Sequence, residues 1–268
     1  MTAGLLGSWR EIAIPVPTAE AKRGGEEPWR VHRVGAPSLD HLRRSRLLTP
    51  EELQRKLGVA IEPGALLVAY HPLTIARDTL READELYAAL EASPGQVLFC
   101  FPNADAGSRE LIRRAEAFCA GRSASRLFVN LAPPTYWSLL RSVGALLGNS
   151  SSGIMEAPSL ALPVVNVGLR QAGRERARNI LDAPAECRAI RAALERALDP
   201  AFRREIARMT SPYGDGRAAE RIAAALVEAP LGERLLHKRP VPLATPDARV
   251  PQERAYPAAA EFNKTRTD

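Results

Sequence analysis

Between residues 64 and 167, short continuous apolar runs alternate with longer stretches in which apolar side chains recur every three or four positions. The short runs predict strands that are buried on both faces, and the longer stretches predict amphipathic helices. Five strands are expected, at residues 64–72, 96–101, 126–131, 145–147 and 163–167. Helices are expected at residues 77–91, 108–119, 134–143, 154–160, 184–198 and 200–208, and a turn within 212–222 launches a last helix.

This alternation of strands and helices predicts right-handed βαβ units and one open parallel sheet, an α/β fold of the Rossmann-like kind. Ligands of such sheets bind outside the carboxyl ends of the strands. Five residues lie at or just after the carboxyl ends of successive predicted strands: His71, Asn103, Leu131, Ser150 and Arg170. We therefore expect a ligand site along this edge of the sheet.

The turn between the fourth and fifth predicted strands reads Gly-Asn-Ser-Ser-Ser-Gly, from Gly148 to Gly153. Its backbone N–H groups and hydroxyls precede the helix expected at 154–160, and the positive end of a helix favours a bound anion. Glu156 falls near that helix start, where a carboxylate is favoured and can accept hydrogen bonds from hydroxyls. The alternative is a structural N-cap, because Ser and Asn favour such positions in any protein.

Composition narrows the class of protein. The apolar runs are far shorter than a bilayer span, and the first residues carry no leading basic region typical of a signal peptide, so we expect a cytoplasmic protein without a membrane partner. The net charge of +6 comes from arginines scattered among acids, which argues against a nucleic-acid partner and suits a small anionic ligand. The three cysteines have no metal-ligand spacing, so no metal site is expected.

The stretch from Ala145 to Gly168 is similar to the UDP-N-acetylglucosamine 2-epimerase family, most closely to its hydrolysing branch. The similarity continues through the arginine-rich run at 168–179 and the turn at 212–222, and covers about residues 24 to 228. It implies a GT-B-type architecture of two Rossmann-like domains, of which this chain matches the second. It also implies a UDP-sugar as the ligand and no cofactor, and is compatible with a homo-oligomer.

The resemblance assigns roles to the turn. It places Ser150 and Ser151 on the diphosphate of UDP and Glu156 on the ribose hydroxyls. It places the backbone of Leu131 at the uracil edge, and it makes Arg170 a further UDP contact, with Arg174 and Gln171 as weaker candidates. A solvated face is the plain alternative for this arginine-rich loop, although guanidinium groups are preferred partners of phosphates.

Two strand-end residues complete the implied site. The resemblance places His71 on the nucleotide phosphate and makes it the catalytic candidate of this chain, since an imidazolium beside a leaving diphosphate stabilises developing charge. It places Asn103 on UDP as well. The alternatives are a histidine that caps the strand and an asparagine that forms a turn.

The expected organisation follows from the resemblance and from composition. Residues 1–24 are unassigned and flexible, 25–60 hold the end of the family's first domain and linker helices, and 61–229 form the UDP-binding domain. Thr49 and Pro50 predict a helix start within the linker. Residues 230–268 are rich in prolines and charges and are predicted to be disordered.

The implied reaction removes the C2 proton of UDP-N-acetylglucosamine and expels UDP, and water then adds to give N-acetylmannosamine for sialic acid-type sugars. In the family the bases are carboxylates of the first domain, to which this chain has no counterpart, so we expect it to supply the UDP-binding half. The alternatives are a UDP-sugar-dependent glycosyltransferase of the same architecture and a non-catalytic UDP-sugar-binding module. The sugar itself, N-acetylglucosamine or a 2,4-diacetamido relative, stays open.

Overall fold

The computed structural model describes residues 27–72, 81–101 and 108–237. These residues fall into two compact units, one made of 27–31 with 230–237 and the other of the described part of 32–229. The larger unit contains the sheet, and each unit is described by itself.

The smaller unit joins a 3-10 helix, η1 (Pro28–Arg30), to the one-turn helix α11 (Glu233–Leu236). The Arg30 guanidinium donates to the carbonyls of Arg234 and Leu235, at 2.8 and 3.1 Å, and also pairs with Glu27. The prediction of disorder from residue 230 onward is therefore wrong for the α11 segment, because a distant arginine satisfies its carbonyl groups. The rest of the predicted tail, 238–268, lies outside the described residues.

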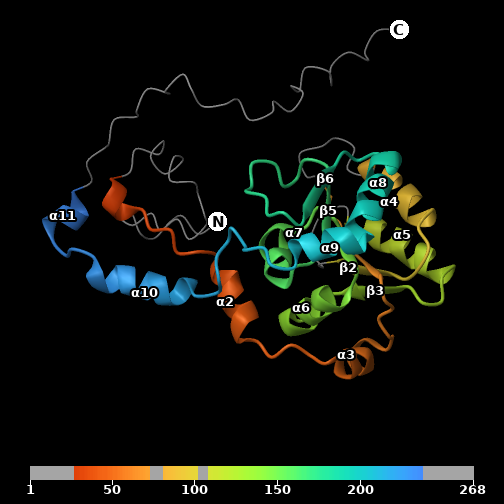
Figure 1. The fold of residues 1–268 in the computed structure, drawn as a ribbon, viewed down its shortest axis with the longest axis horizontal. Coiled ribbons are helices and arrows are strands. Elements are labelled where there is room, and N and C mark those ends of the chain that lie inside the picture. Colours follow the sequence, from red (N-terminus) through yellow and green to blue (C-terminus); the bar gives the residue numbers. More distant parts are fainter. Residues whose placement is uncertain (1–26, 73–80, 102–107, 238–268) are drawn as a thin grey trace, which may run out of the picture. The chain divides into compact units, whose positions relative to one another are not determined.

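The larger unit is built on a parallel six-stranded sheet in the order β3-β2-β1-β4-β5-β6 (Figure 1). Its strands are β1 (Leu66–Ala69), β2 (Val97–Phe101), β3 (Arg126–Val129), β4 (Ala145–Gly148), β5 (Val164–Val167) and β6 (Ile180–Ala183). The open parallel α/β fold and all five predicted strands are confirmed. The sequence analysis missed β6, whose short Ile-Leu-Asp-Ala run sits at the edge of the sheet and is only partly buried.

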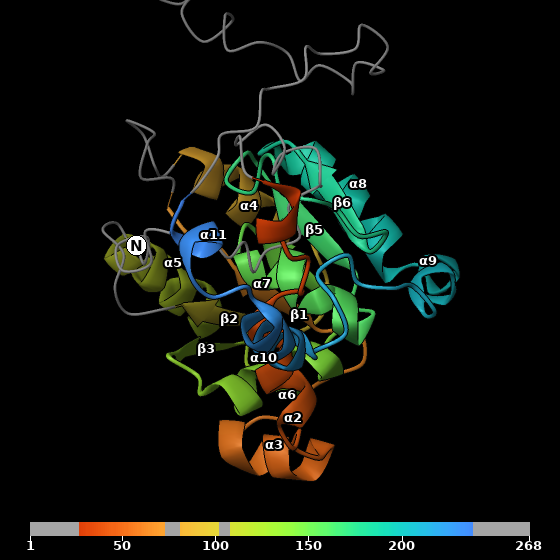
Figure 2. The same cartoon turned by 90° about the vertical axis from the view of Figure 1, so that its left-hand side faces the viewer.

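Helices cover both faces of the sheet (Figure 2). Their bounds are α2 (Pro37–Arg44), α3 (Pro50–Leu57), α4 (Arg81–Glu91), α5 (Ser108–Ala120), α6 (Pro133–Ser142), α7 (Ser151–Met155), η2 (Ala157–Leu160), α8 (Cys187–Leu198), α9 (Pro200–Ile206) and α10 (Ala218–Glu228). Side chains of β1 alternate between the two cores: Leu66 and Val68 pack with α4, α5 and α8, whereas Leu67 packs with α2, α3 and α6. This two-sided burial explains why the strands are continuous apolar runs.

The linker helices α2 and α3 belong to this unit, and each takes part in a helix cap. Thr49 and Glu52 form a capping box at the start of α3, with Pro50 in the first turn, which confirms the predicted helix start. The buried Asp40 carboxylate of α2 accepts hydrogen bonds from the backbone N–H groups of Ala218 and Ala219, at 2.8 and 2.7 Å. Asp40 therefore caps α10 from a distant part of the chain.

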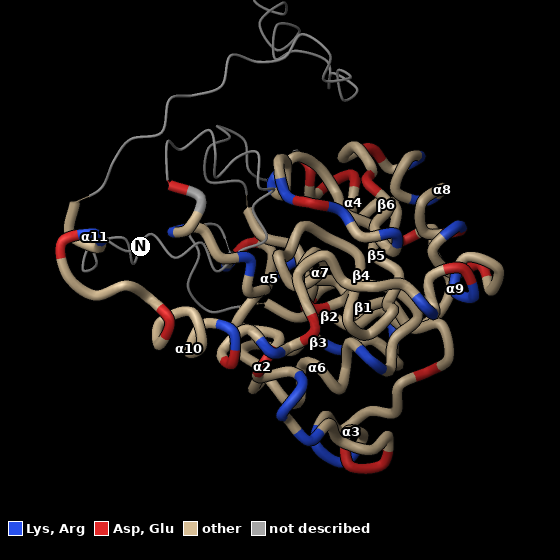
Figure 3. Tube along the Cα trace, turned by 60° about the vertical axis from the view of Figure 1, so that its left-hand side comes forward, with Lys and Arg blue, Asp and Glu red and all other residues tan. Residues whose placement is uncertain are grey.

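Charged residues of both signs are interleaved along the helices of the sheet unit, as in α3 and α9 (Figure 3). Within the described residues, no helix combines the length and the apolar character needed to cross a bilayer.

The strand order reverses between β1 and β4, which pair in register from Leu66 with Ala145 to Ala69 with Gly148. The chain enters β1 and leaves towards β2 on one side, and it returns to β4 on the other side. Such a reversal opens a crevice at the carboxyl ends of the two strands, because their connections run in opposite directions. Gly148 ends β4 with a φ of +140°, and a Cβ there would lie 2.2 Å from the Ala69 carbonyl oxygen.

We predict that Gly148→Ala lowers the free energy of unfolding by about 3 kcal/mol or more, because it adds a backbone clash to an unfavourable dihedral angle. Gly58→Ala is the matched control: Gly58 ends α3 with a φ of +68° and has no atom within 4 Å of the added Cβ. Its expected cost is about 1 kcal/mol. Urea unfolding measures both, and equal costs would contradict the close approach of β1 and β4.

Candidate functional site

The crevice between β1 and β4 brings two of the predicted site segments together. His71 lies two residues beyond β1, and the Asn-Ser-Ser-Ser turn lies directly beyond β4. Because the two strands pair in register, their ends are level and the two segments lie side by side. The carboxyl edge at the reversal of strand order is the place where open α/β sheets bind ligands.

Asn149 joins these two segments. Its side-chain Oδ1 accepts a hydrogen bond from the backbone N–H of His71 at 2.7 Å, and its Nδ2 donates to the His71 carbonyl at 2.8 Å. Its own backbone N–H donates to the Ala69 carbonyl at 3.2 Å. Asn149 is completely buried, so this paired contact holds the position of His71 relative to the serine turn.

The loop after β5 is tied to the same residue. Arg170 Nη1 and Gln171 Nε2 both donate to the Asn149 carbonyl oxygen, at 3.0 and 2.7 Å. Gln171 is buried, whereas Arg170 is exposed and has further N–H donors on its guanidinium group. The structure thus brings the predicted residues His71, Ser150 and Arg170 to one place, with Asn149 at its centre.

The serine turn itself is a capped helix start. The Ser150 hydroxyl oxygen accepts from the Ser152 backbone N–H and so caps α7, which begins at Ser151. The Ser152 hydroxyl donates to Ser150 Oγ at 3.0 Å and is 2.7 Å from the hydroxyl of Tyr136 on α6. The structural N-cap considered for this turn is therefore present, and it leaves the Ser151 hydroxyl outside the cap.

The expected helix at 154–160 differs from the observed one. The chain forms a single α-turn, α7, followed by the 3-10 helix η2, and Glu156 is the residue between them. Glu156 is thus both the C-cap of α7 and the N-cap of η2, where its side chain makes no capping hydrogen bond. It does not lie within the first turn of a single helix over 154–160, as was expected. Pro158 explains the break, because a proline cannot continue the α-helical hydrogen bonds.

Glu156 is nevertheless unusual. Its Oε2 atom is buried and forms no hydrogen bond of standard geometry, and neither does the buried hydroxyl of Ser38 on α2, with which the Glu156 carboxyl interacts. Burial raises the pKa of the Glu156 carboxyl, while the residue's own backbone N–H, the Ser38 hydroxyl and the positive charge of Arg174 oppose the rise. A buried acceptor of this kind carries a desolvation cost that a hydroxyl-bearing ligand would relieve.

One predicted residue lies apart from this group, and another lies outside the described residues. Leu131 follows β3, which is separated from β4 by β2 and β1, so a ligand that touches both Leu131 and Ser150 has to be extended along the sheet edge. The Leu131 backbone also forms a hydrogen bond with the Cys100 thiol. Burial raises the pKa of this thiol to about 11, although the hydrogen bond opposes the rise. Asn103 lies outside the described residues.

Sequence reasoning missed Asn149 and Tyr136 as members of the site and ranked Gln171 low. Asn149 stood in the singled-out turn, but an asparagine in a turn gives no sign of which backbone it will contact. Tyr136 lies on α6 and reaches the turn only through the packing of α6 beside α7 and η2. Among the described residues, no group of His, Cys, Asp and Glu side chains is arranged to hold a metal ion.

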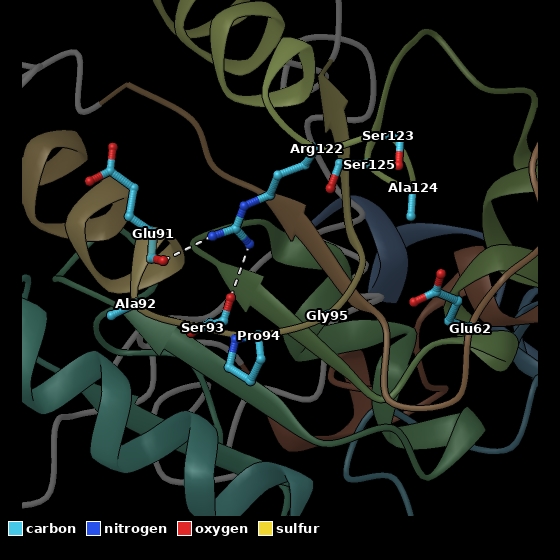
Figure 4. Close-up of a pocket in the computed structure, with 10 residues that line it drawn as sticks. All are labelled: Glu62, Glu91, Ala92, Ser93, Pro94, Gly95, Arg122, Ser123, Ala124 and Ser125. Carbon is cyan, nitrogen blue, oxygen red and sulfur yellow. Dashed lines mark hydrogen bonds between the residues drawn. The ribbon is translucent and has the colours of Figure 1, made fainter.

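An open hollow elsewhere on the sheet carries no predicted residue (Figure 4). It is lined by the segments that precede β1, β2 and β3, so it lies at the amino edge, opposite the strand ends just described. Its only arginine, Arg122, donates to the carbonyls of Glu91 and Ser93 at the end of α4 and covers the ring of Phe118. Arg122 thus caps the C-terminal end of α4, which accounts for the arginine of this hollow.

A six-stranded Rossmann-like sheet with polar groups gathered at its switch point defines a nucleotide-binding class of α/β domain. The family model for UDP-N-acetylglucosamine 2-epimerase matches residues 16–227. The chain therefore belongs to the UDP-N-acetylglucosamine 2-epimerase family, and its curated relatives place it in the hydrolysing branch. This confirms the resemblance noted in the sequence.

Two relatives illustrate the match. The chain is 32% identical over 234 residues to a UDP-N,N'-diacetylbacillosamine 2-epimerase (hydrolyzing) of Legionella pneumophila. The aligned region covers 87% of this chain and 61% of the relative. It is 33% identical over 161 residues to a GDP/UDP-N,N'-diacetylbacillosamine 2-epimerase (hydrolyzing) of Campylobacter jejuni, covering 59% of this chain and 42% of the relative. The chain thus spans about half of the length of these relatives.

Solved structures show the same fold. The UDP-GlcNAc 2-epimerase of Methanocaldococcus jannaschii, in complex with UDP-GlcNAc and UDP, superposes with a TM-score of 0.62 at 14% identity, covering 83% of this chain and 61% of that one. The UDP-GlcNAc 2-epimerase of Neisseria meningitidis bound to UDP-GlcNAc gives a TM-score of 0.60 at 16% identity, with the same coverage.

We predict that Asn149→Ala lowers the free energy of unfolding by about 3 kcal/mol, because it removes two hydrogen bonds to the backbone of His71 from a fully buried position. Asn179→Ala is the control, since Asn179 is equally buried and donates one hydrogen bond, to the Leu162 carbonyl. Its expected cost is about 1.5 kcal/mol. Equal losses in urea unfolding would contradict the role given to Asn149.

We predict that Glu156→Gln raises the thermal midpoint of the ligand-free protein at pH 7. A carboxyl whose pKa is raised in the folded state stabilises the fold when protonated and loses that contribution as the pH rises through its folded pKa. The advantage of the glutamine variant should therefore shrink as the pH falls through the folded pKa of Glu156, because the carboxyl then becomes neutral, as the glutamine is. The exposed Glu228→Gln is the control, and a lower midpoint for Glu156→Gln at pH 7 would contradict the prediction.

Proposed function

We propose that this chain binds the UDP moiety of a nucleotide sugar at the crevice between β1 and β4. The observation that carries the proposal is the buried Glu156 carboxylate oxygen, which forms no hydrogen bond of standard geometry, beside a hydroxyl-rich turn at the switch point, within the part of the chain that matches the family model. A diphosphate would accept from the turn and from arginine, and a ribose would donate to Glu156. UDP offers both groups in one molecule.

Each proposed contact has its own chemistry. The Ser150 and Ser151 hydroxyls donate to the diphosphate, and Arg170 uses the guanidinium donors that do not reach the Asn149 carbonyl. Glu156 accepts from the ribose hydroxyls, which offsets the cost of its burial. The backbone of Leu131 contacts the uracil edge, at the far end of an extended ligand. Asn103 is retained as a UDP contact from the sequence prediction.

His71 is the proposed catalytic residue of this chain. Its backbone is held by Asn149 next to the serine turn, so its side chain starts from a position beside the proposed diphosphate. An imidazolium there would stabilise the negative charge that develops on UDP as the bond to the sugar breaks.

We propose that the reaction served is that of a hydrolysing UDP-N-acetylglucosamine 2-epimerase, in the biosynthesis of sialic acid-type sugars. Loss of the C2 proton and of UDP gives a 2-acetamidoglucal, and addition of water gives N-acetylmannosamine. The residues proposed above hold the leaving UDP. As the family resemblance implies, we assign proton transfer at C2 to carboxylates of the family's first domain. We also propose that the protein acts in the cytoplasm.

The sugar can be narrowed by experiment. The names of the two relatives described above specify diacetylbacillosamine, which makes UDP-N,N'-diacetylbacillosamine a substrate to test beside UDP-N-acetylglucosamine. Release of UDP with the free 2-epimeric sugar would support the epimerase. A glycosylated acceptor would instead favour the glycosyltransferase, and UDP binding with neither product would favour a binding module.

We predict that the chain binds UDP in a calorimetric titration and that Glu156→Ala weakens the affinity about 10-fold to 100-fold, because it removes a charged acceptor. Ser151→Ala is expected to weaken it about tenfold through the loss of one donor to the diphosphate. Ser159→Ala is the control, since Ser159 is exposed on the neighbouring η2. If the folded chain does not bind UDP, the proposal is overturned.

A further inference from the structure

Three hydroxyl groups form a row that leads from the core of the sheet unit to the serine turn. The Tyr136 hydroxyl lies 2.7 Å from Ser152 Oγ, and Ser152 Oγ lies 3.0 Å from Ser150 Oγ. Tyr136 comes from α6, whereas both serines belong to the turn after β4. The row therefore connects a helix on one face of the sheet to the switch point.

The hydrogen bonds in this row have a direction. Ser150 Oγ accepts from both the backbone N–H and the hydroxyl of Ser152, so both of its lone pairs are used. The hydrogen of the Ser150 hydroxyl is then free to be donated away from the turn. Because Ser152 spends its only hydroxyl hydrogen on Ser150, Tyr136 has to be the donor in the first bond of the row.

The surroundings of Tyr136 keep it in this role. Its neighbours on α6, Thr135 and Trp137, are buried and anchor that part of the helix in the core. Burial raises the pKa of the Tyr136 hydroxyl; hydrogen bonding with Ser152 and Ser150 opposes the rise, and the nearby Cys100 and Glu156 add to it. Like any tyrosine, Tyr136 is protonated at neutral pH. A tyrosine held in this way donates, and its donation strengthens each following bond of the row.

We propose that Tyr136 is a positioning residue that aims the Ser150 hydroxyl hydrogen at a phosphate group of the ligand. The proposal rests on the proposed function, since it assumes that the turn faces the diphosphate of UDP. Tyr136 does not itself touch the ligand. It acts through Ser152, and its effect is limited to the anionic part of the ligand.

The test compares UDP with uridine, which has the base and ribose but no phosphate. We expect Tyr136→Phe to weaken UDP binding about fivefold to tenfold, the effect of one hydrogen bond, and to leave the affinity for uridine within about twofold. Tyr87→Phe is the matched control. Tyr87 also donates one hydrogen bond, to the Leu111 carbonyl at 3.0 Å, but it joins α4 to α5 away from the turn. It should leave the affinities for both ligands unchanged.

A second variant, Ser152→Ala, keeps the proposal testable if Tyr136→Phe fails to fold. Ser152→Ala breaks the same row at its centre and should weaken UDP binding to a similar extent. The double variant should then bind UDP about as weakly as Ser152→Ala alone, because the hydrogen bond by which Tyr136 joins the row is the one with Ser152. Thermal unfolding of each variant shows that the folded protein is being titrated.

The outcomes separate the two proposals. If the unaltered chain fails to bind UDP, the proposed function is overturned and this inference with it. If the unaltered chain binds UDP but both variants bind it equally well, only the role of Tyr136 is overturned. If Tyr136→Phe weakens UDP and uridine alike, the tyrosine is merely structural and the inference is again wrong.

Discussion

The structure depends most on the contact between the side chain of Asn149 and the backbone of His71. One amide group satisfies both an N–H and a carbonyl at the end of β1, and the carbonyl of the same residue receives Arg170 and Gln171 from the loop after β5. Three strand ends thus meet at a fully buried residue. In a low-dielectric environment a satisfied network of this kind is rigid, and a partly satisfied one is costly.

The site combines such satisfied groups with one that is left unsatisfied. Serine hydroxyls and Tyr136 pair with one another, whereas Glu156 has a buried oxygen that forms no hydrogen bond of standard geometry and a pKa raised by burial. A fold accepts such a cost where a ligand repays it on binding. All of these residues lie within the part of the chain that matches the family model.

The sheet was predictable from the sequence because strands buried on both faces must be apolar throughout, and five of them stood out between helical patterns. β6 was missed because an edge strand needs fewer apolar residues, and α11 was missed because Arg30, two hundred residues earlier, supplies its partner. The carboxyl edge could be predicted for a similar reason: parallel strands bring their ends to one edge whatever their order. Glu156 was expected near the start of one helix, whereas it lies between α7 and η2, because Pro158 interrupts the α-helical hydrogen bonds.

The sequence by itself determined the class of fold, the edge at which polar residues gather and the family, since all three follow from local periodicity and from residues in a fixed order. Only the tertiary structure decided the strand order, and with it the switch point between β1 and β4. It alone decided that Asn149 binds the backbone of His71 and that Tyr136 reaches Ser152. Contacts between residues distant in sequence leave no local pattern, because they depend on how separate elements pack and not on how each one forms.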